Sequence, residues 1–234
     1  MPRFVMKFSK KGYTKYISHL DLLRVFKRAF KVMGLDIKYS QGFNPHPKMG
    51  FAQPLSLGYS SVAEYLEFET VGEHDPDEIK TLFTGKLPED VKILDLFRFD
   101  QEVKSLAAET VACRYLISVP VASDMDLESL EALLDGYLSQ ESIRAMKRMK
   151  KTKSIEEVEI KDKIRDIKVR LEDGNAVFDC LLDSGSQSNL SPEQVISSFL
   201  QYSGWTIERW DIEVERTEIL YSDRIRFRHI DNPL

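Results

Sequence analysis

Residues 38–58 bring together polar side chains, aromatic rings and a stiff backbone, as a binding loop requires. Between positions 42 and 58 there are three glycines and three prolines. Glycine permits backbone shapes closed to other residues, and proline removes freedom that binding would otherwise cost. Asn44 and His46 each precede a proline, which restricts both to extended conformations. We therefore expect Asn44, His46 and Lys48 to project from one side of a stiff arm.

Hydrogen-bond donors, a cation and aromatic rings on one rigid loop suit a nucleic-acid strand or a phosphorylated ligand. Phosphates accept hydrogen bonds, and bases stack on aromatic rings. Phe43 and Phe51 supply the rings, and Gln41 adds an amide. The alternative is a proline-rich crossover that serves only rigid packing, with both phenylalanines in the core. For the polar residues the pattern favours binding, whereas for the two rings it leaves the choice open.

Positive charge is concentrated in two places although the net charge of the chain is −5. Residues 1–50 hold eleven Lys/Arg against two acids, and a second basic block spans residues 144–153. Such zones indicate a local polyanion-binding face, although solubilising lysines would give the same pattern. The candidate binding residues are His19, Arg24, Lys27, Arg28, Gln41, Phe43, Asn44, His46, Lys48, Arg144, Lys147 and Arg148.

His19 and His46 also raise the possibility of catalysis. Two histidines beside a scissile phosphate could act as general acid and base in metal-free RNA cleavage. The sequence does not bring them together, and a single histidine at the start of a helix is more often a capping or surface residue. Glu64 and Glu67 show no partner, so we interpret them as a solvated strand face. The sequence favours a non-catalytic protein over an enzyme.

Cysteine and histidine usage predicts no resident metal or cofactor. Cys113 and Cys180 are the only cysteines, and each is expected to be a buried thiol in a strand. An iron–sulfur cluster takes about three or four thiolates, and a structural zinc takes about four Cys/His ligands. No apolar run approaches the roughly 20 residues of a membrane span. No export signal precedes the first strand, so we expect a cytoplasmic protein without membrane association.

The elements that would position the loop follow the order β-α-β-β-α-β. A strand at Phe4–Phe8 precedes Ser18, which forms a capping box with Asp21. The helix that follows has one apolar stripe from Leu22 to Met33 with basic residues opposite, and Gly34 ends it. The remaining expected elements are a strand at 37–39, a strand at 63–69, a helix ending at 83 and a strand at 91–97.

A polar linker at 100–110 leads into a second run of similar order. Asp173 and Gly174 predict a hairpin turn, and Pro192 opens the last helix. We therefore predict an α+β fold of two tandem ferredoxin-like (βαββαβ) halves with antiparallel sheets, in domains 1–100 and 111–221. The expected elements of the second half are strands at 112–119, 142–150, 164–171, 176–183 and 206–220, with helices at 126–138 and 192–202 and an excursion at 151–163.

Three segments resemble one known family, namely SHLDLLRVFKRAF (18–30), YSQGFNPHPKMGFAQPLSLG (39–58) and SVAEYLEFE (61–69). They are similar to the bacterial radical-SAM-linked family of unknown function, which occurs alone or as a C-terminal extension of B12-binding-type radical SAM proteins. The resemblance is weaker in the second half, where VEIKDKIRDIKV (158–169) lacks the proline of the family's Asp-Ile-Arg-Pro-like turn. It implies an accessory role beside a radical SAM enzyme. The cluster of that enzyme would have to reside in the partner.

The leading hypothesis is an RNA-binding substrate adaptor, for tRNA or rRNA, acting with a radical SAM enzyme in trans. It depends on the basic side of the first helix, the loop at 42–58 and the second basic block. A second hypothesis is a protein-interaction module that docks the partner enzyme through the same loop without RNA. The third is a metal-free ribonuclease that uses His19 and His46.

Overall fold

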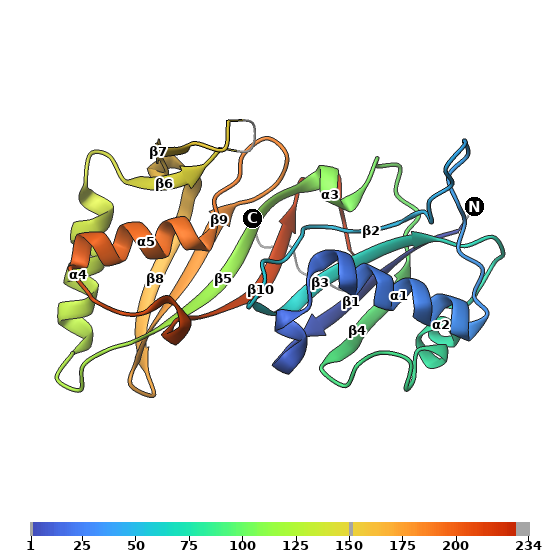
Figure 1. Cartoon of the computed structure of the whole chain (residues 1–234), viewed down its shortest axis with the longest axis horizontal. Coiled ribbons are helices and arrows are strands. Elements are labelled where there is room, and N and C mark those ends of the chain that lie inside the picture. Colours follow the sequence, from blue (N-terminus) through green and yellow to red (C-terminus); the bar gives the residue numbers. More distant parts are fainter. Residues whose placement is uncertain (1, 150–151, 228–234) are drawn as a thin grey trace. The chain divides into compact units, whose positions relative to one another are not determined.

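The computed structural model describes residues 2–149 and 152–227, and Figure 1 shows the order of its helices and strands. These residues form two compact units, one made of the chain up to Val111 together with Arg216 onward, the other of Ala112–Glu215. The division falls inside strands β5 (Thr110–Pro120) and β10 (Glu213–Tyr221). Each unit combines helices with antiparallel strands, so the α+β class is confirmed.

In the first unit, β1 pairs with both β3 and β4, and the short β2 pairs with the end of β3. All of these pairs are antiparallel. Helices α1 and α2 lie on one face of the sheet (Figure 1). The bounds are β1, Arg3–Lys10; η1, Gly12–Tyr16; α1, His19–Met33; β2, Met49–Phe51; β3, Ser60–Glu69; α2, Pro76–Leu82; β4, Val91–Arg98; and α3, Leu106–Glu109.

The core of the first unit follows from the two periodicities in the sequence. Alternate residues of β1 (Phe4, Met6 and Phe8) are fully buried against the helices. The apolar stripe of α1 covers them, with the rings of Phe8 and Phe26 5.0 Å apart.

The predicted ends of α1 are confirmed. The Ser18 hydroxyl accepts from the backbone N–H of Asp21 at 3.2 Å and donates to its carboxylate at 2.6 Å. Gly34 ends the helix at φ +71°, in the left-handed region that glycine enters without strain. The helix therefore carries the chain to the start of the loop in a fixed direction.

In the second unit, β9 pairs antiparallel with both β5 and β8. Helix α5 packs on this sheet through Phe199, whose ring lies 4.8 Å from that of Phe178. Cys113 and Cys180 are buried free thiols, as predicted. The Asp173–Gly174 turn is confirmed by positive φ at both residues. The bounds are α4, Leu127–Ser139; β6, Arg144–Arg148; β7, Ile155–Glu159; η2, Lys161–Lys163; β8, Ile164–Glu172; β9, Asn175–Asp183; α5, Pro192–Ser203; and η3, Arg209–Asp211.

Two sequence-based expectations, a strand before the loop and an unstructured linker, differ from the structure. The strand expected at 37–39 is reduced to isolated bridges at Ile37 and Tyr39, because Tyr39 faces Pro47, which has no N–H to donate. The strand β2 instead lies inside the loop. The polar linker at 100–110 contains helix α3, whose Leu106 is fully buried.

No helix in the described part of the chain is long and apolar enough to span a membrane.

Candidate functional site

The outer part of the loop, residues 38–48, is a hairpin-like projection that we call the arm. The Ser40 N–H donates to the His46 carbonyl at 2.8 Å, and the Lys48 N–H donates to the Lys38 carbonyl at 2.7 Å. The Ser40 hydroxyl also accepts from the His46 N–H at 3.0 Å. Gly42 at the tip adopts φ +133°, which favours glycine. The arm is thus held by backbone hydrogen bonds at its base and carries a tip of five residues, 41–45.

Side chains of the arm point into solvent rather than into the core. Gln41, Phe43, Asn44 and His46 are all exposed, and the Phe43 ring is fully so. Phe51 differs, since it is buried and packs 5.8 Å from the ring of Phe8. Of the two rings that the sequence left undecided, one is therefore core and the other is a fully exposed aromatic side chain. The Phe43 ring is therefore accessible to another molecule, although single exposed apolar side chains are common on protein surfaces.

The base of the arm is tied to the end of β3 by one carboxylate. Glu69 accepts from Lys48 at 3.0 Å and lies 3.2 Å from Lys38. Partial burial raises the pKa of Glu69, but the hydrogen bonds from Lys48 and Lys38 outweigh it and hold the pKa below its ordinary value. Lys48 is therefore engaged within the protein, and its position is set by Glu69.

A hollow of about 500 Å³ lies between α1 and the arm, and we call it the α1–arm hollow. Lys27, Arg28 and Lys31 of α1 line it on one side, and Tyr39 and Pro47 of the arm line it on the other. The structure thus brings the basic side of α1 to the base of the loop. The remaining lining residues are Phe30, Leu35, Asp36, Ile37 and Met49.

Two other predicted residues of α1 have different surroundings. Arg24 is exposed and forms an ion pair with Asp21 at 2.6 Å. The ring of His19 packs edge-on against Phe51 at 5.3 Å. Burial lowers the pKa of His19, and Lys10 lowers it further while Glu64 opposes both. Within residues 2–149 and 152–227, the structure shows no contact between the side chains of His19 and His46, so it does not bring the two histidines together.

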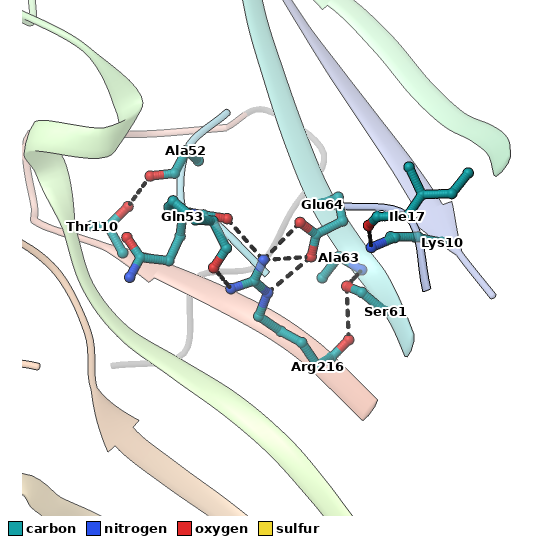
Figure 2. Close-up of polar contacts among 10 residues, drawn as sticks. Lys10, Ile17, Ala52, Gln53, Ser61, Ala63, Glu64, Thr110 and Arg216 are labelled. Atoms are coloured by element: carbon teal, nitrogen blue, oxygen red, sulfur yellow. Dashed lines mark hydrogen bonds and ion pairs between the residues drawn. The ribbon is translucent and has the colours of Figure 1, made fainter. Parts of the chain in front are cut away.

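The inner part of the loop, residues 49–58, is fixed by a buried ion pair that no sequence pattern predicted (Figure 2). The Arg216 guanidinium donates to the Glu64 carboxylate at 2.6–2.9 Å from both Nε and Nη2, and the two side chains are 0% and 4% exposed. The same guanidinium donates to the carbonyls of Gln53 at 2.9 Å and Pro54 at 3.3 Å. Arg216 therefore holds the loop backbone against β3.

Lys10 is a second buried cation in the same region. Its ammonium group donates to the Ile17 carbonyl at 2.8 Å (Figure 2). Burial lowers the pKa of Lys10, with Glu64 opposing the change and Arg216 adding to it. Glu64 is thus the carboxylate that compensates a buried positive region.

The expectation of a solvated face at Glu64 and Glu67 was wrong. Glu64 is buried and forms an ion pair with Arg216. Glu67 forms an ion pair with Arg3, and its carboxylate accepts from the N–H of Leu106 at 3.1 Å. The partner of Glu64 is 152 positions away, so no local pattern indicates it.

The second basic block lies in the second unit, on β6. This strand pairs with the acidic β7, so that Arg144 faces Glu159 and Lys147 faces Glu156. Arg144 also forms an ion pair with Glu157 at 3.0 Å. Arg148 is exposed opposite Ile155, and Lys150 and Lys151 lie outside the described residues. Acids of the next strand along the chain therefore offset much of the block's charge.

The comparisons with known proteins concern family and fold. No curated protein matches the chain, and no group of three or more potential metal ligands occurs among the described residues. A chain in the crystal structure of a Cbf5-Nop10-Gar1 complex is similar, with a TM-score of 0.50 and 11% identity over 94% of this chain. This chain spans about half the length of that one (50%), and at such identity the likeness concerns the fold alone.

A second similar structure is that of an unknown protein from Galdieria sulphuraria, with 10% identity over 92% of this chain and 98% of that one. Its TM-score of 0.27 carries no information about the fold. The family comparison is more informative. The model of a family described as an uncharacterized protein conserved in bacteria (DUF2344) matches residues 3–192, and the chain therefore belongs to that family.

Proposed function

We propose that this protein is an RNA-binding accessory protein, a substrate adaptor that presents tRNA or rRNA to a partner radical SAM enzyme. The observation that carries the RNA part is the α1–arm hollow, where Lys27, Arg28 and Lys31 face Tyr39 of the arm. Three cations beside the exposed ring of Tyr39 match the two contacts that single-stranded RNA offers, its phosphates and its bases. Phe43 at the tip of the arm adds a second exposed ring outside the hollow.

The radical SAM partner is supported by sequence alone. The segments 18–30, 39–58 and 61–69 carry the resemblance to the radical-SAM-linked family. The two cysteines are both buried in the second unit, in strands β5 and β9. The enzyme's own cluster would belong to the partner chain.

The test is RNA binding by the triple variant Lys27→Gln/Arg28→Gln/Lys31→Gln, measured by filter binding with tRNA over a range of salt. The logarithm of the binding constant falls with the logarithm of the salt concentration, with a slope of about −0.7 for each phosphate contact to single-stranded RNA. Loss of three contacts should therefore make the slope of the triple variant shallower by about 2. The matched control is Lys86→Gln/Lys92→Gln/Lys104→Gln, which removes the same charge from exposed residues that do not line the hollow.

A slope that falls equally in both variants would show that only net charge matters and would overturn the proposed site. Absence of salt-dependent tRNA and rRNA binding by the unmodified protein would overturn the RNA function itself. In that case the second candidate, docking of the radical SAM enzyme without RNA, gains support, and the exposed ring of Phe43 is the observation that favours it. The ribonuclease hypothesis has no such observation, because the His19 ring packs against Phe51.

We also propose that the chain is a tandem of ferredoxin-like halves, with domains at 1–100 and 111–221. The antiparallel pairing of β1 with β3 and β4, with β2 on β3, supports a split βαβ arrangement for the first half. The pairing of β9 with β5 and β8 supports the same order for the second. An open sheet face with aromatic residues is one way in which such folds bind RNA.

A further inference from the structure

A separate hollow of about 660 Å³ lies in the first unit, at the end of β4, and we call it the β4-end hollow. Its volume falls within the roughly 300–1,000 Å³ typical of small-molecule sites. It shares no lining residue with the α1–arm hollow. It is lined by Phe97, Arg98, Phe99, Asp100, Gln101, Arg224, Arg226 and Phe227.

Aromatic rings provide the apolar part of this hollow. The ring of Phe227 lies parallel to that of Tyr65 at 5.7 Å, and it meets Phe97 edge-on at 5.2 Å. Phe99 is buried, with its ring 6.1 Å from that of Phe227 and the Arg3 guanidinium 4.8 Å above it. Rings held on several sides lose little freedom when a planar ligand stacks on them.

Two guanidinium groups provide the charge. Arg98 is already paired with Glu73 at 2.6 Å and Asp100 at 2.8 Å. Among the residues that the structure describes, the exposed Arg224 has only a distant contact of 3.8 Å with Glu109, whose carboxylate also accepts from the Ser222 hydroxyl.

The Arg226 guanidinium has no ion pair or hydrogen bond among the residues that the structure describes, which end at 227. Its backbone is fixed, however, because its N–H donates to Gln101 Oε1 at 3.0 Å and its carbonyl accepts from the Gln101 amide. A positioned backbone with an uncommitted cationic head is suited to an anionic ligand.

We propose that the β4-end hollow is a nucleotide site, in which a base stacks on the partly exposed ring of Phe227 while Arg224 and Arg226 bind its phosphate. Guanidinium groups bind phosphate through paired hydrogen bonds, and bases stack on aromatic faces without regard to sequence. The nucleotide is either a free mononucleotide or the terminal nucleotide of an RNA chain. Both present the same ring and the same phosphate to the hollow.

The first experiment is calorimetric titration of the full chain with AMP, GMP, CMP, UMP and adenosine. Saturable binding of a monophosphate is expected, with adenosine weaker by about tenfold or more because the charge-assisted hydrogen bonds are lost. Arg224→Gln/Arg226→Gln should weaken the monophosphate by about the same factor, and Arg224→Lys/Arg226→Lys should restore part of the loss. Both arginines are exposed, and the unfolding midpoint checks that the fold is kept.

The matched control is Lys86→Gln/Lys92→Gln, which removes the same charge from exposed residues outside the hollow. Its affinity for the monophosphate should equal that of the unmodified protein. If no monophosphate binds at millimolar concentration, or if Arg224→Gln/Arg226→Gln binds as the unmodified protein does, the proposal is wrong.

Competition separates the two sources of nucleotide. If a chain terminus is the source, a short RNA with a 5′- or 3′-phosphate should displace the monophosphate, whereas the same RNA with hydroxyl ends should not. Displacement by neither RNA assigns the hollow to a free mononucleotide. The proposal does not rest on the RNA function, because Lys27→Gln/Arg28→Gln/Lys31→Gln leaves every lining residue of the β4-end hollow in place. That variant should keep its affinity for the monophosphate.

Discussion

Two carboxylates of β3 hold the two parts of the loop in different ways. Glu64 binds Arg216, which in turn holds the backbone of Gln53 and Pro54, and this pair is removed from water. Glu69 binds Lys38 and Lys48 at the base of the arm, where all three side chains are between 26% and 39% exposed. The same chemistry of carboxylate and cation is therefore used once in the interior and once at the surface.

The difference lies in what surrounding water does to each pair. If a buried charge is separated from its partner, no water is available to solvate it, and the separation is costly. The Glu64–Arg216 pair therefore keeps the inner part of the loop in one position. The pairs at Glu69 compete with solvent and contribute little to stability. We infer that the inner part of the loop is a fixed support and that the arm can adjust its position when it meets a partner. The comparison predicts a decreasing series of effects, from Glu64 through the arm tip to Glu69.

The largest effect is expected for Glu64→Gln. This change leaves the Arg216 guanidinium buried without a compensating charge, and it should lower the free energy of unfolding by about 3–5 kcal/mol. Urea unfolding followed by circular dichroism measures the loss. Since a whole domain is stable by only about 5–15 kcal/mol, the variant could fail to accumulate as folded protein.

The double variant Glu64→Leu/Arg216→Met provides the second measurement. Removing both charges leaves apolar side chains in place of the pair, with Lys10 as the buried cation that Glu64 no longer compensates, so its stability should lie between that of Glu64→Gln and that of the unmodified protein. If the double variant loses as much stability as Glu64→Gln, or if Glu64→Gln loses no more than about 1 kcal/mol, the pair does not act as a buried charge compensation.

The same contrast explains which parts of the molecule could be predicted. Strands and helices with a clear period, such as α1 and its caps at Ser18 and Gly34, were predicted correctly because local pattern determines them. The exposure of the arm tip was expected from its prolines and glycines. The Glu64–Arg216 pair could not be found, because it joins positions 152 residues apart. The acidic partners of the basic block on β6 were not predicted for a different reason, since the pairing of β6 with β7 was not expected from the sequence pattern.

An intermediate effect is expected at the arm tip, on binding rather than on stability. Phe43→Ala removes a ring that makes no contact with the core, so the unfolding midpoint should not change. If the ring stacks on a base, RNA affinity should fall by about 1–3 kcal/mol, which is roughly 5- to 150-fold. Filter binding at constant salt measures the affinity, and Phe43→Trp is the control that keeps a stacking surface. An affinity unchanged in Phe43→Ala would exclude the tip from the RNA interface.

The smallest effect is expected for Glu69→Gln, because its two lysine partners are partly exposed. The loss at neutral pH should be below about 1 kcal/mol, and Glu89→Gln is the exposed control on the same unit.

The effect also depends on pH in a defined direction. The pKa of Glu69 is lower in the folded protein than in the unfolded chain, so the folded state binds its proton less readily. The contribution of Glu69 to the free energy of unfolding is therefore complete above its pKa in the unfolded chain, and it is lost as the pH falls through its pKa in the folded protein.

The stability difference between the unmodified protein and Glu69→Gln should accordingly be constant near neutrality and shrink towards zero in acid. Hydrogen exchange gives a local check of the same interaction. The amides of Ser40 and Lys48, which close the arm, should exchange faster in Glu69→Gln, while the protected amides of β1 should not change. If the β1 amides also exchange faster, Glu69 supports the whole sheet and the arm is not the independently adjustable part. If the arm amides are unaffected, their hydrogen bonds hold the arm without Glu69.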